Sequence, residues 1–107
     1  MTLDTIALYV NKIACLLSLD KHDRVVTECN DTLRLIRNHR NRFEEKQTPE
    51  EKKRLHNMEI RVSIRRGNAL AKLNRVSEAI QEYERALKLD PNNDLIKRDL
   101  ETLKRGA

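Results

Sequence analysis

Two arginines four residues apart stand out in the segment IRVSIRRGNALAKL, residues 60–73. Arg61 and Arg65 lie one turn apart on one face of the helix that this segment predicts. A guanidinium is a planar fork of donors that can bind a carboxylate through two hydrogen bonds, whereas a lysine acts as a point charge. The pair therefore predicts anion recognition, and carboxylates in particular. An ordinary charged helix face is the alternative, because the chain has 22 lysines and arginines.

Other chemistries lack the residues that they need. His22, His39 and His56 are scattered, without metal-ligating partners at useful spacing, so we expect surface histidines and no metal site. No serine or cysteine lies in a nucleophile motif, and no glycine-rich loop could hold a phosphate. We therefore expect no catalytic residue, no cofactor and no enzymatic activity.

Two basic segments offer a second kind of anion recognition. They are RLIRNHRNR at 34–42 and KKRLH at 52–56. Such side chains can contact nucleic-acid phosphates. Phe43 is the only aromatic residue beside them, however, so base stacking is poorly supported. We favour a solvated helix face and do not expect a nucleic-acid partner, although RNA binding through these segments stays open as an alternative.

The composition of the chain favours a small helical domain. Charged residues make up 36% of the 107 residues and aromatic residues only 3%, so the core must consist of leucine, isoleucine, valine and alanine. Glycine and proline number two each, which favours long helices with few turns. The net charge of +5 indicates an acidic partner without naming its class. The length fits one domain or a piece of a larger protein.

Several features bear on the cellular setting. Cys15 and Cys29 are too few for a disulfide framework, and their apolar surroundings predict two buried, reduced thiols. No apolar run approaches the roughly 20 residues of a membrane span. The first residues include Asp4 and lack the basic region of a signal peptide. We therefore expect a cytoplasmic protein with no membrane partner.

Apolar spacing predicts five helices joined by short turns. The first helix covers about 3–19, a polar turn DKHD follows at 20–23, and the second helix continues toward Phe43. The third helix has the clearest start: Thr48 can cap it and Glu51 completes a capping box. Pro49 suits its first position. The expected caps of the last two helices are Ser77 and either Asp90 or Asn92.

The two halves of the chain repeat one another. Each matched pair of residues is separated by 54 positions. The pairs are Leu16 and Leu70, Leu19 and Leu73, Val25 and Ala79, Cys29 and Tyr83, Leu33 and Leu87, and Leu35 and Leu89. The pattern predicts a helix, a short turn and a helix, present twice.

The second copy carries a recognisable set of small, aromatic and proline residues, namely Gly67, Leu70, Ala79, Tyr83, Ala86 and Pro91. Its sequence RRGNALAKLNRVSEAIQEYERALKLDPNN resembles a tetratricopeptide (TPR) repeat. The first copy, ALYVNKIACLLSLDKHDRVVTECNDTLRL, is similar but has Ile13, Val25 and Thr32 where glycine or alanine is usual. The resemblance implies an all-α fold of antiparallel helix pairs with a C-terminal capping helix. The expected parts are repeat one at 2–36, an insert at 37–59, repeat two at 60–93 and the capping helix at 94–105.

The insert is the departure from this family. TPR units repeat every ~34 residues, so an offset of 54 leaves 20 extra residues between the copies. We expect these residues to lengthen the two neighbouring helices by about ten residues each, or ~15 Å. The result would be a projecting antiparallel hairpin with Phe43 facing Leu55 or Met58. A disordered insert is the competing interpretation.

The resemblance also implies a binding site. In TPR co-chaperones, polar residues of successive first helices hold the C-terminal carboxylates of a chaperone peptide. The residues that match this clamp here are Asn11, Arg61 and Arg65, and Asn68 could add a hydrogen bond one turn further on. Arg66 would point elsewhere, solvated or paired. The lysine and asparagine that the family takes from a preceding repeat are missing, so the clamp is partial or the chain is a fragment.

The implied partner is the acidic C-terminal tail of an Hsp90- or Hsp70-type chaperone, ending in Glu-Glu-Val-Asp. Client or assembly-factor proteins would bind through other regions. The segments LYVNKIACLLSL and EYERALKLDPNND, with the lengthened joint, resemble most the C-terminal TPR region of an axonemal dynein assembly factor that also has a p23-like CS domain. The alternatives are a TPR scaffold for an unrelated protein and a basic helical RNA-binding module.

Overall fold

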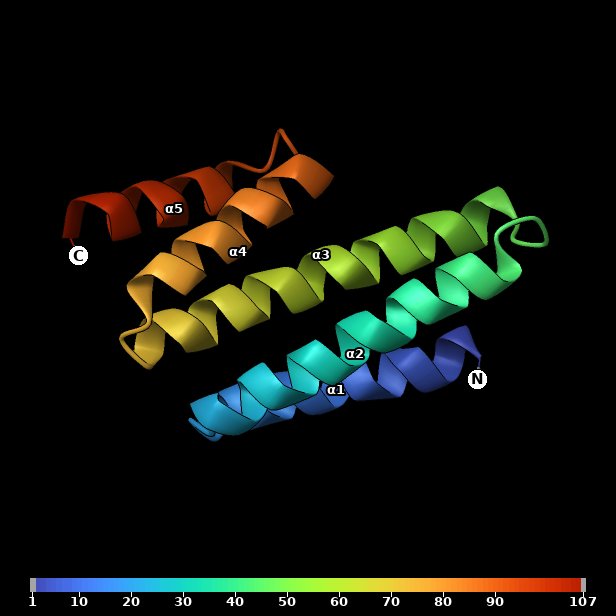
Figure 1. The fold of residues 1–107 in the computed structure, drawn as a ribbon, viewed down its shortest axis with the longest axis horizontal. Coiled ribbons are helices and arrows are strands. Elements are labelled where there is room, and N and C mark those ends of the chain that lie inside the picture. Colours follow the sequence, from blue (N-terminus) through green and yellow to red (C-terminus); the bar gives the residue numbers. More distant parts are fainter. Residues whose placement is uncertain (1, 107) are drawn as a thin grey trace.

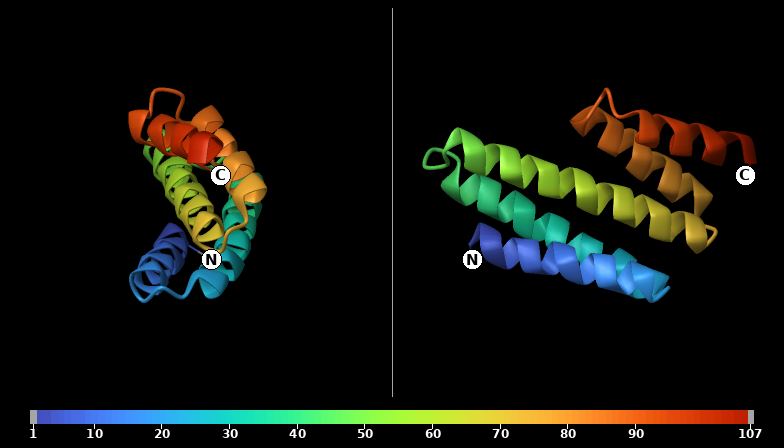
Figure 2. Two further views of the ribbon diagram at one scale, coloured as in Figure 1. Left: turned by 90° about the vertical axis from the view of Figure 1, so that its left-hand side faces the viewer. Right: turned by 180° about the vertical axis from the view of Figure 1, so that it is seen from behind.

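The computed structural model describes residues 2–106, which form five α-helices in an antiparallel array (Figure 1). The helices are α1 (Leu3–Ser18), α2 (His22–Phe43), α3 (Pro49–Lys72), α4 (Val76–Leu89) and α5 (Asp94–Gly106). Each helix packs against the next, and α1 also packs against α3. Viewed end-on, α1, α3 and α5 lie along one side of the array and α2 and α4 along the other (Figure 2). The predicted all-α architecture of helix pairs is confirmed.

The same backbone turn closes both helix pairs. In the first turn, the amide of Lys21 donates a 3.0 Å hydrogen bond to the carbonyl of Leu16. In the second turn, the amide of Arg75 donates a 2.9 Å hydrogen bond to the carbonyl of Leu70. Asp20 and Asn74 occupy the left-handed region, with φ of 57° and 62°, a conformation that aspartate and asparagine tolerate. This is the Schellman arrangement of a helix end. The predicted 54-residue repeat is therefore present in the backbone as well as in the leucines.

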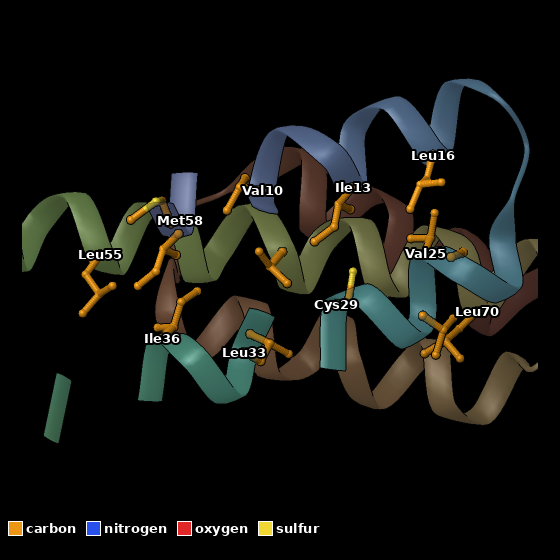
Figure 3. Packing of buried hydrophobic residues seen from close by; sticks show 14 of the residues in the cluster. Val10, Ile13, Leu16, Val25, Cys29, Leu33, Ile36, Leu55, Met58 and Leu70 are labelled. Atoms are coloured by element: carbon orange, nitrogen blue, oxygen red, sulfur yellow. The ribbon is translucent and has the colours of Figure 1, made fainter. Parts of the chain in front are cut away.

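Where the two helices of a pair meet, one helix has a large residue and the other a small one, and the two helix pairs have them in opposite order. In the second pair, a Cβ added to Gly67 would lie 3.1 Å from two ring carbons of Tyr83. The positions 54 residues earlier hold Ile13 and Cys29, both fully buried in the core cluster (Figure 3). A large residue opposite a small one fills the space in both pairs. The first pair thus needs neither the glycine nor the aromatic residue of the family pattern.

This close contact predicts the effect of enlarging Gly67. A Gly67→Val variant should lower the free energy of unfolding by about 1–3 kcal/mol, because the ring of Tyr83 is 2% exposed and has little room to move. Gly106 is the matched control, since a Cβ there would meet nothing within 4 Å. Gly106→Val should leave the urea midpoint nearly unchanged. Equal midpoints for both variants would show that the contact with Tyr83 is loose.

The lengthened hairpin consists of α2 and α3, which have 22 and 24 residues against 16 in α1 and 14 in α4. The insert is therefore helical outside the link at 44–48, and not disordered. Ile36 and Leu55, each 1% exposed, carry the apolar core into this region (Figure 3). The hairpin extends beyond α4, whose Leu89 carbonyl accepts a 2.8 Å hydrogen bond from Nε2 of His56. On its other side, α1 runs close to the tip (Figure 1).

Phe43 does not lie where the sequence predicted. Its ring is partly exposed and lies beside His39, with ring centroids 4.8 Å apart. It lines a cavity with Leu3 of α1 and is not among the residues packed against the cluster that contains Leu55 and Met58. The expected contact with those two residues is replaced because the first turn of α1 reaches the hairpin tip.

The predicted start of α3 is confirmed, but the predicted start of α4 is wrong. Thr48 Oγ1 accepts a hydrogen bond from the amide of Glu51 at 3.1 Å, and Pro49 is the first residue of the helix. α4 already begins at Val76, so Ser77 lies inside its first turn and caps nothing. The Schellman turn before it leads directly into the helix, which leaves no room for a separate capping residue.

The cap of α5 also lies after both candidates, one residue after Asn92 and three residues after Asp90. Asn93 Oδ1 accepts a hydrogen bond from the amide of Ile96 at 3.1 Å, so Asn93 is the cap rather than Asp90 or Asn92. Asp90 supports it, because the Asn93 side-chain amide donates to the Asp90 carboxylate at 3.0 Å. The turn that follows Asp90 occupies the intervening positions.

The cysteines differ from one another, and the histidines differ from expectation. Cys29 is buried, and burial raises the pKa of its thiol to about 12. Cys15 is exposed, because it lies two positions after the buried Ile13 and so turns away from the core. The prediction of a buried thiol is therefore wrong for Cys15, although both cysteines are free. The three histidines are half-buried rather than on the open surface.

Candidate functional site

The groove between α1 and α3 collects polar side chains that could bind an anion. Its volume is about 190 Å³. Its lining residues are Ala7, Val10 and Asn11 of α1 and Arg54, Asn57, Met58 and Arg61 of α3. The α3 residues follow the three- and four-residue spacing of one helix face.

Asn11 and Arg61 are the two predicted site residues that the structure brings together. They come from different helices and line the same groove. Both side chains are exposed, and neither has a hydrogen bond or ion pair with another residue of 2–106. An amide and a guanidinium in this state can offer several donors to one carboxylate.

Arg65, one turn after Arg61 on α3, is not among the residues that line the groove and already has a structural contact. Its Nη1 donates to the backbone carbonyl of Val10 at 2.8 Å, which ties α3 to α1. Partial burial lowers the pKa of Arg65, and the positive charge of Arg61 lowers it further. An anion between the two guanidinium groups would relieve this repulsion. Arg65 can therefore both position the groove and favour a negative ligand.

Asn68 does not join this group. The hydroxyl of Tyr83 donates a short hydrogen bond to Oδ1 of Asn68, which connects α3 to α4. Burial raises the pKa of Tyr83 to about 12, with a smaller contribution from the negative charge of Asp99, so the hydroxyl keeps its proton near neutral pH. Asn68 is not among the residues that line the α1–α3 groove. A role for it in ligand binding would require the hydrogen bond to Tyr83 to be exchanged.

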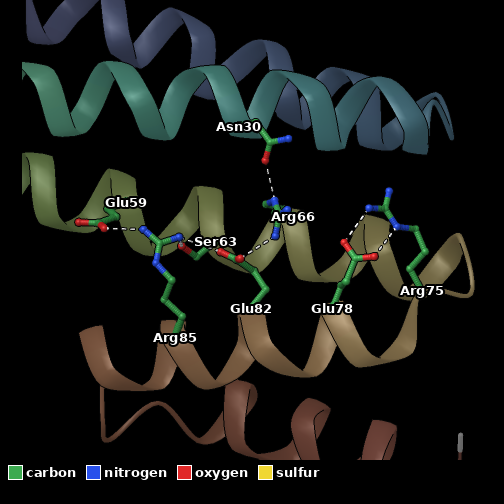
Figure 4. A network of polar contacts seen from close by, with 8 residues as sticks. All are labelled: Asn30, Glu59, Ser63, Arg66, Arg75, Glu78, Glu82 and Arg85. Atoms are coloured by element: carbon green, nitrogen blue, oxygen red, sulfur yellow. Dashed lines mark hydrogen bonds and ion pairs between the residues drawn. The ribbon is translucent and has the colours of Figure 1, made fainter.

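Arg66 points to the opposite side of α3 and is paired, as one of the two expected outcomes allowed. Its Nε donates to Asn30 of α2 and its Nη1 to Glu82 of α4, both at 2.8 Å (Figure 4). Glu82 is only 6% exposed. Arg66 therefore connects three helices and has a structural role.

A second buried carboxylate extends this contact into a network (Figure 4). Glu59 is 7% exposed and lies 2.6 Å from Arg40 and 3.0 Å from Arg85. Arg85 also lies 3.1 Å from Glu82. Sequence reasoning missed this network because its partners on different helices lie between 16 and 36 positions apart. Two glutamates at apolar positions of α3 and α4 were the only available signal.

The basic hairpin has fewer free charges than its composition suggests. Arg40 is held by Glu59 at 2.6 Å. The guanidinium carbon of Arg42 lies 5.6 Å from the ring centroid of Phe43, a cation–π distance. Four glutamates in the segment 44–51 interrupt the positive charge at the tip. The hairpin is thus a mixed-charge surface.

A larger cavity of about 410 Å³ lies near the hairpin tip. Its lining residues are Thr2, Leu3, Asp4, His39, Phe43, Lys46, Gln47, Glu51 and Arg54. Arg54 Nη2 and Asp4 Oδ1, at the wall of this cavity, are 2.9 Å apart. Because Arg54 also lines the α1–α3 groove, the cavity and the groove meet at this ion pair.

Comparison with protein families identifies the second helix pair. A family model described as tetratricopeptide repeat matches residues 61–93. This segment is a tetratricopeptide repeat. The matched TPR segment begins at Arg61, so two predicted ligand contacts, Arg61 and Arg65, lie on the first helix of a TPR unit.

Curated relatives match most of the chain. It is 30% identical over 97 residues, or 91% of its length, to dynein axonemal assembly factor 4 of Rattus norvegicus and of Mus musculus. The corresponding protein of Pongo pygmaeus is 29% identical over the same length. The predicted resemblance to an axonemal dynein assembly factor is confirmed. The chain spans about a fifth of the length of these relatives, 20% of each.

No solved structure matches the chain. Stacked TPR units present an extended surface to protein partners, so the chain is a protein–protein interaction module. Within residues 2–106, none of the helices combines the length and the apolar character that crossing a bilayer requires.

Proposed function

We propose that the α1–α3 groove binds the C-terminal carboxylate of an acidic peptide, the tail of an Hsp90- or Hsp70-type chaperone. The observation that carries this proposal is the meeting of Asn11 and Arg61 in one groove, both exposed and both without another partner among the described residues. Several other arginines of the fold are engaged, as Arg40, Arg66 and Arg85 are. Arg24, Arg37 and Arg98 are also exposed without a side-chain partner among the described residues, but none of them lines this groove, whereas Arg61 does so together with Asn11.

A role in dynein assembly is the second part of the proposal. Its support is the similarity to relatives named dynein axonemal assembly factor 4 over 91% of the chain. In this proposal the groove holds the chaperone, while other parts of a longer cytoplasmic protein hold the client. The module would then bring a chaperone to a protein complex during its assembly.

The test is a titration with an acetylated pentapeptide ending in Glu-Glu-Val-Asp. Arg61→Ala should weaken binding about 10- to 100-fold, because a charge-assisted hydrogen bond contributes about 1.5–3 kcal/mol. Replacing the C-terminal carboxylate of the peptide by an amide should weaken binding to the parent protein by a similar factor. The same replacement should weaken binding to the Arg61→Ala variant only slightly. Fluorescence anisotropy of a labelled peptide measures both.

Lys53→Ala is the matched control, because Lys53 carries the same charge and is exposed, but it is not a groove residue. Equal losses from both variants would mean general attraction between a basic protein and an acidic peptide. Arg66 is unsuitable as a control, since its removal would disturb the packing of three helices. Salt-sensitive RNA binding that needs Lys52 and Lys53 but not Arg61 would favour the RNA-binding alternative.

A further inference from the structure

Arg54 is a second cation on the same wall of the groove as Arg61. It precedes Arg61 by seven residues, or nearly two helical turns, which places the two side chains on one face about 10.5 Å apart along α3. Unlike Arg61, it is already paired, because its Nη2 lies 2.9 Å from Oδ1 of Asp4. It also stands where the groove meets the larger cavity.

The pair between Arg54 and Asp4 differs from the other arginine–carboxylate contacts that join separate helices. Glu59 and Glu82 are buried, with side chains 9% and 7% exposed, so releasing one of their arginines would weaken the compensation of a buried charge. The side chains of Arg54 and Asp4 are 46% and 86% exposed. An exposed pair adds little stability. Asp4 also lies in the first turn of α1, where the helix dipole stabilises its charge without Arg54.

Building on the proposed function, we propose that Arg54 binds an acidic side chain three residues before the C-terminal residue of the peptide, and that Asp4 occupies this contact until the ligand replaces it. An extended peptide advances about 3.3–3.6 Å per residue, so three residues cover the distance between the two arginines. The terminal carboxylate lies at Arg61 and the earlier carboxylate at Arg54. The groove thereby selects for two negative charges at a fixed separation.

This contact depends on the lengthened helix. Arg54 lies in the first part of α3, before the segment 61–93 that matches the TPR model. Asp4 can reach it because α1 runs beside the hairpin almost to its tip (Figure 1). The hairpin thus adds a cation to the groove and the first turn of α1 adds its competitor.

The experiment compares two acetylated pentapeptides, one ending in Glu-Glu-Val-Asp and one ending in Gln-Glu-Val-Asp. Arg54→Gln should weaken binding of the first peptide about fivefold and leave the second unchanged. Asp4→Asn should tighten binding of the first peptide about two- to fivefold and leave the second unchanged. The gain should disappear in the double variant Arg54→Gln/Asp4→Asn, because the ligand contact has been removed.

Matched controls separate this contact from a general charge effect. Lys53→Gln removes one positive charge from the neighbouring position of α3, and Glu45→Gln removes one negative charge from the hairpin link, where no ion pair holds it among residues 2–106. Both should leave the two affinities within a factor of about 1.5. Thermal denaturation of each variant shows that the fold is intact.

The outcomes distinguish this contact from the groove itself. Binding that needs Arg61 but responds to Arg54→Gln and Asp4→Asn no more than to the controls would overturn the second contact alone. Binding that appears only in Asp4→Asn would support it strongly, with Asp4 as the competitor. If neither the parent nor Asp4→Asn binds either peptide, both the groove and the second contact are wrong.

Discussion

Replacing Arg66 by methionine should lower the free energy of unfolding by about 3 kcal/mol, near the lower end of the range for breaking a buried ion pair. The guanidinium contacts Asn30 and Glu82, each at 2.8 Å, and the side chain of Glu82 is 7% exposed. Without Arg66 this carboxylate keeps only Arg85 as a charged partner, at 3.1 Å. That remaining partner keeps the loss from reaching the upper end of the range. Urea denaturation followed by circular dichroism measures it.

Arg61→Met is the matched control for this prediction. It makes the same chemical change on a neighbouring turn of α3, where the side chain is exposed and unpaired among the described residues. Its effect should stay within about 0.5 kcal/mol. The double variant Arg66→Met/Glu82→Leu should recover much of the loss, because it leaves no buried charge unpaired. Similar losses in the two single arginine variants would show that the network adds nothing.

Replacing Leu55 by alanine should lower the free energy of unfolding by about 2–5 kcal/mol. Leu55 is 1% exposed and belongs to the main core cluster, so its removal leaves a cavity in the lengthened part of the hairpin. The loss should be greatest near the tip. Amides of 37–43 and 52–56 should lose hydrogen-exchange protection before those of 60–72, which are held by the second helix pair.

Phe43→Ala is the informative comparison for Leu55. The ring is partly exposed and lines an open cavity rather than the core, so its removal should cost less than about 1 kcal/mol. A loss larger than that of Leu55→Ala would mean that the hairpin tip is organised around Phe43. In that case the ring of Phe43 would fill the cavity beside α1 in solution.

Local signals in the sequence predicted the fold well, because each is contained in a short segment. Thr48 and Glu51 are enough to predict the start of α3, and in the structure the amide of Glu51 donates a 3.1 Å hydrogen bond to Thr48 Oγ1. The equal spacing of leucines predicted a repeat whose turns then proved alike at Asp20 and Asn74. The helical insert followed from the absence of breakers before Thr48.

The sequence predicted less about the site, because side-chain partners depend on which helices meet. Nothing near Asn68 shows that Tyr83 of the next helix will bind its side chain. Nothing near Arg65 shows that its guanidinium will reach the carbonyl of Val10, 55 positions earlier. The position of Phe43 likewise depends on α1, because Phe43 lines a cavity with Leu3, and the sequence does not show that this helix reaches the hairpin tip. Asn11 and Arg61 could be placed because the repeat fixes which faces look into one groove.

The shared turn geometry of the two helix pairs has an evolutionary consequence. Both pairs close with the same hydrogen bonds 54 positions apart, while the extra residues lie between them, in α2 and α3. Insertions and deletions at this joint can therefore accumulate without disturbing either closing turn. Natural selection could lengthen or shorten the hairpin here, and an insertion between Arg54 and Arg61 in α3 would also change the spacing of these two arginines. A duplicated unit with a variable joint would thus let a lineage change the ligand spacing that its groove accepts while keeping the rest of the domain.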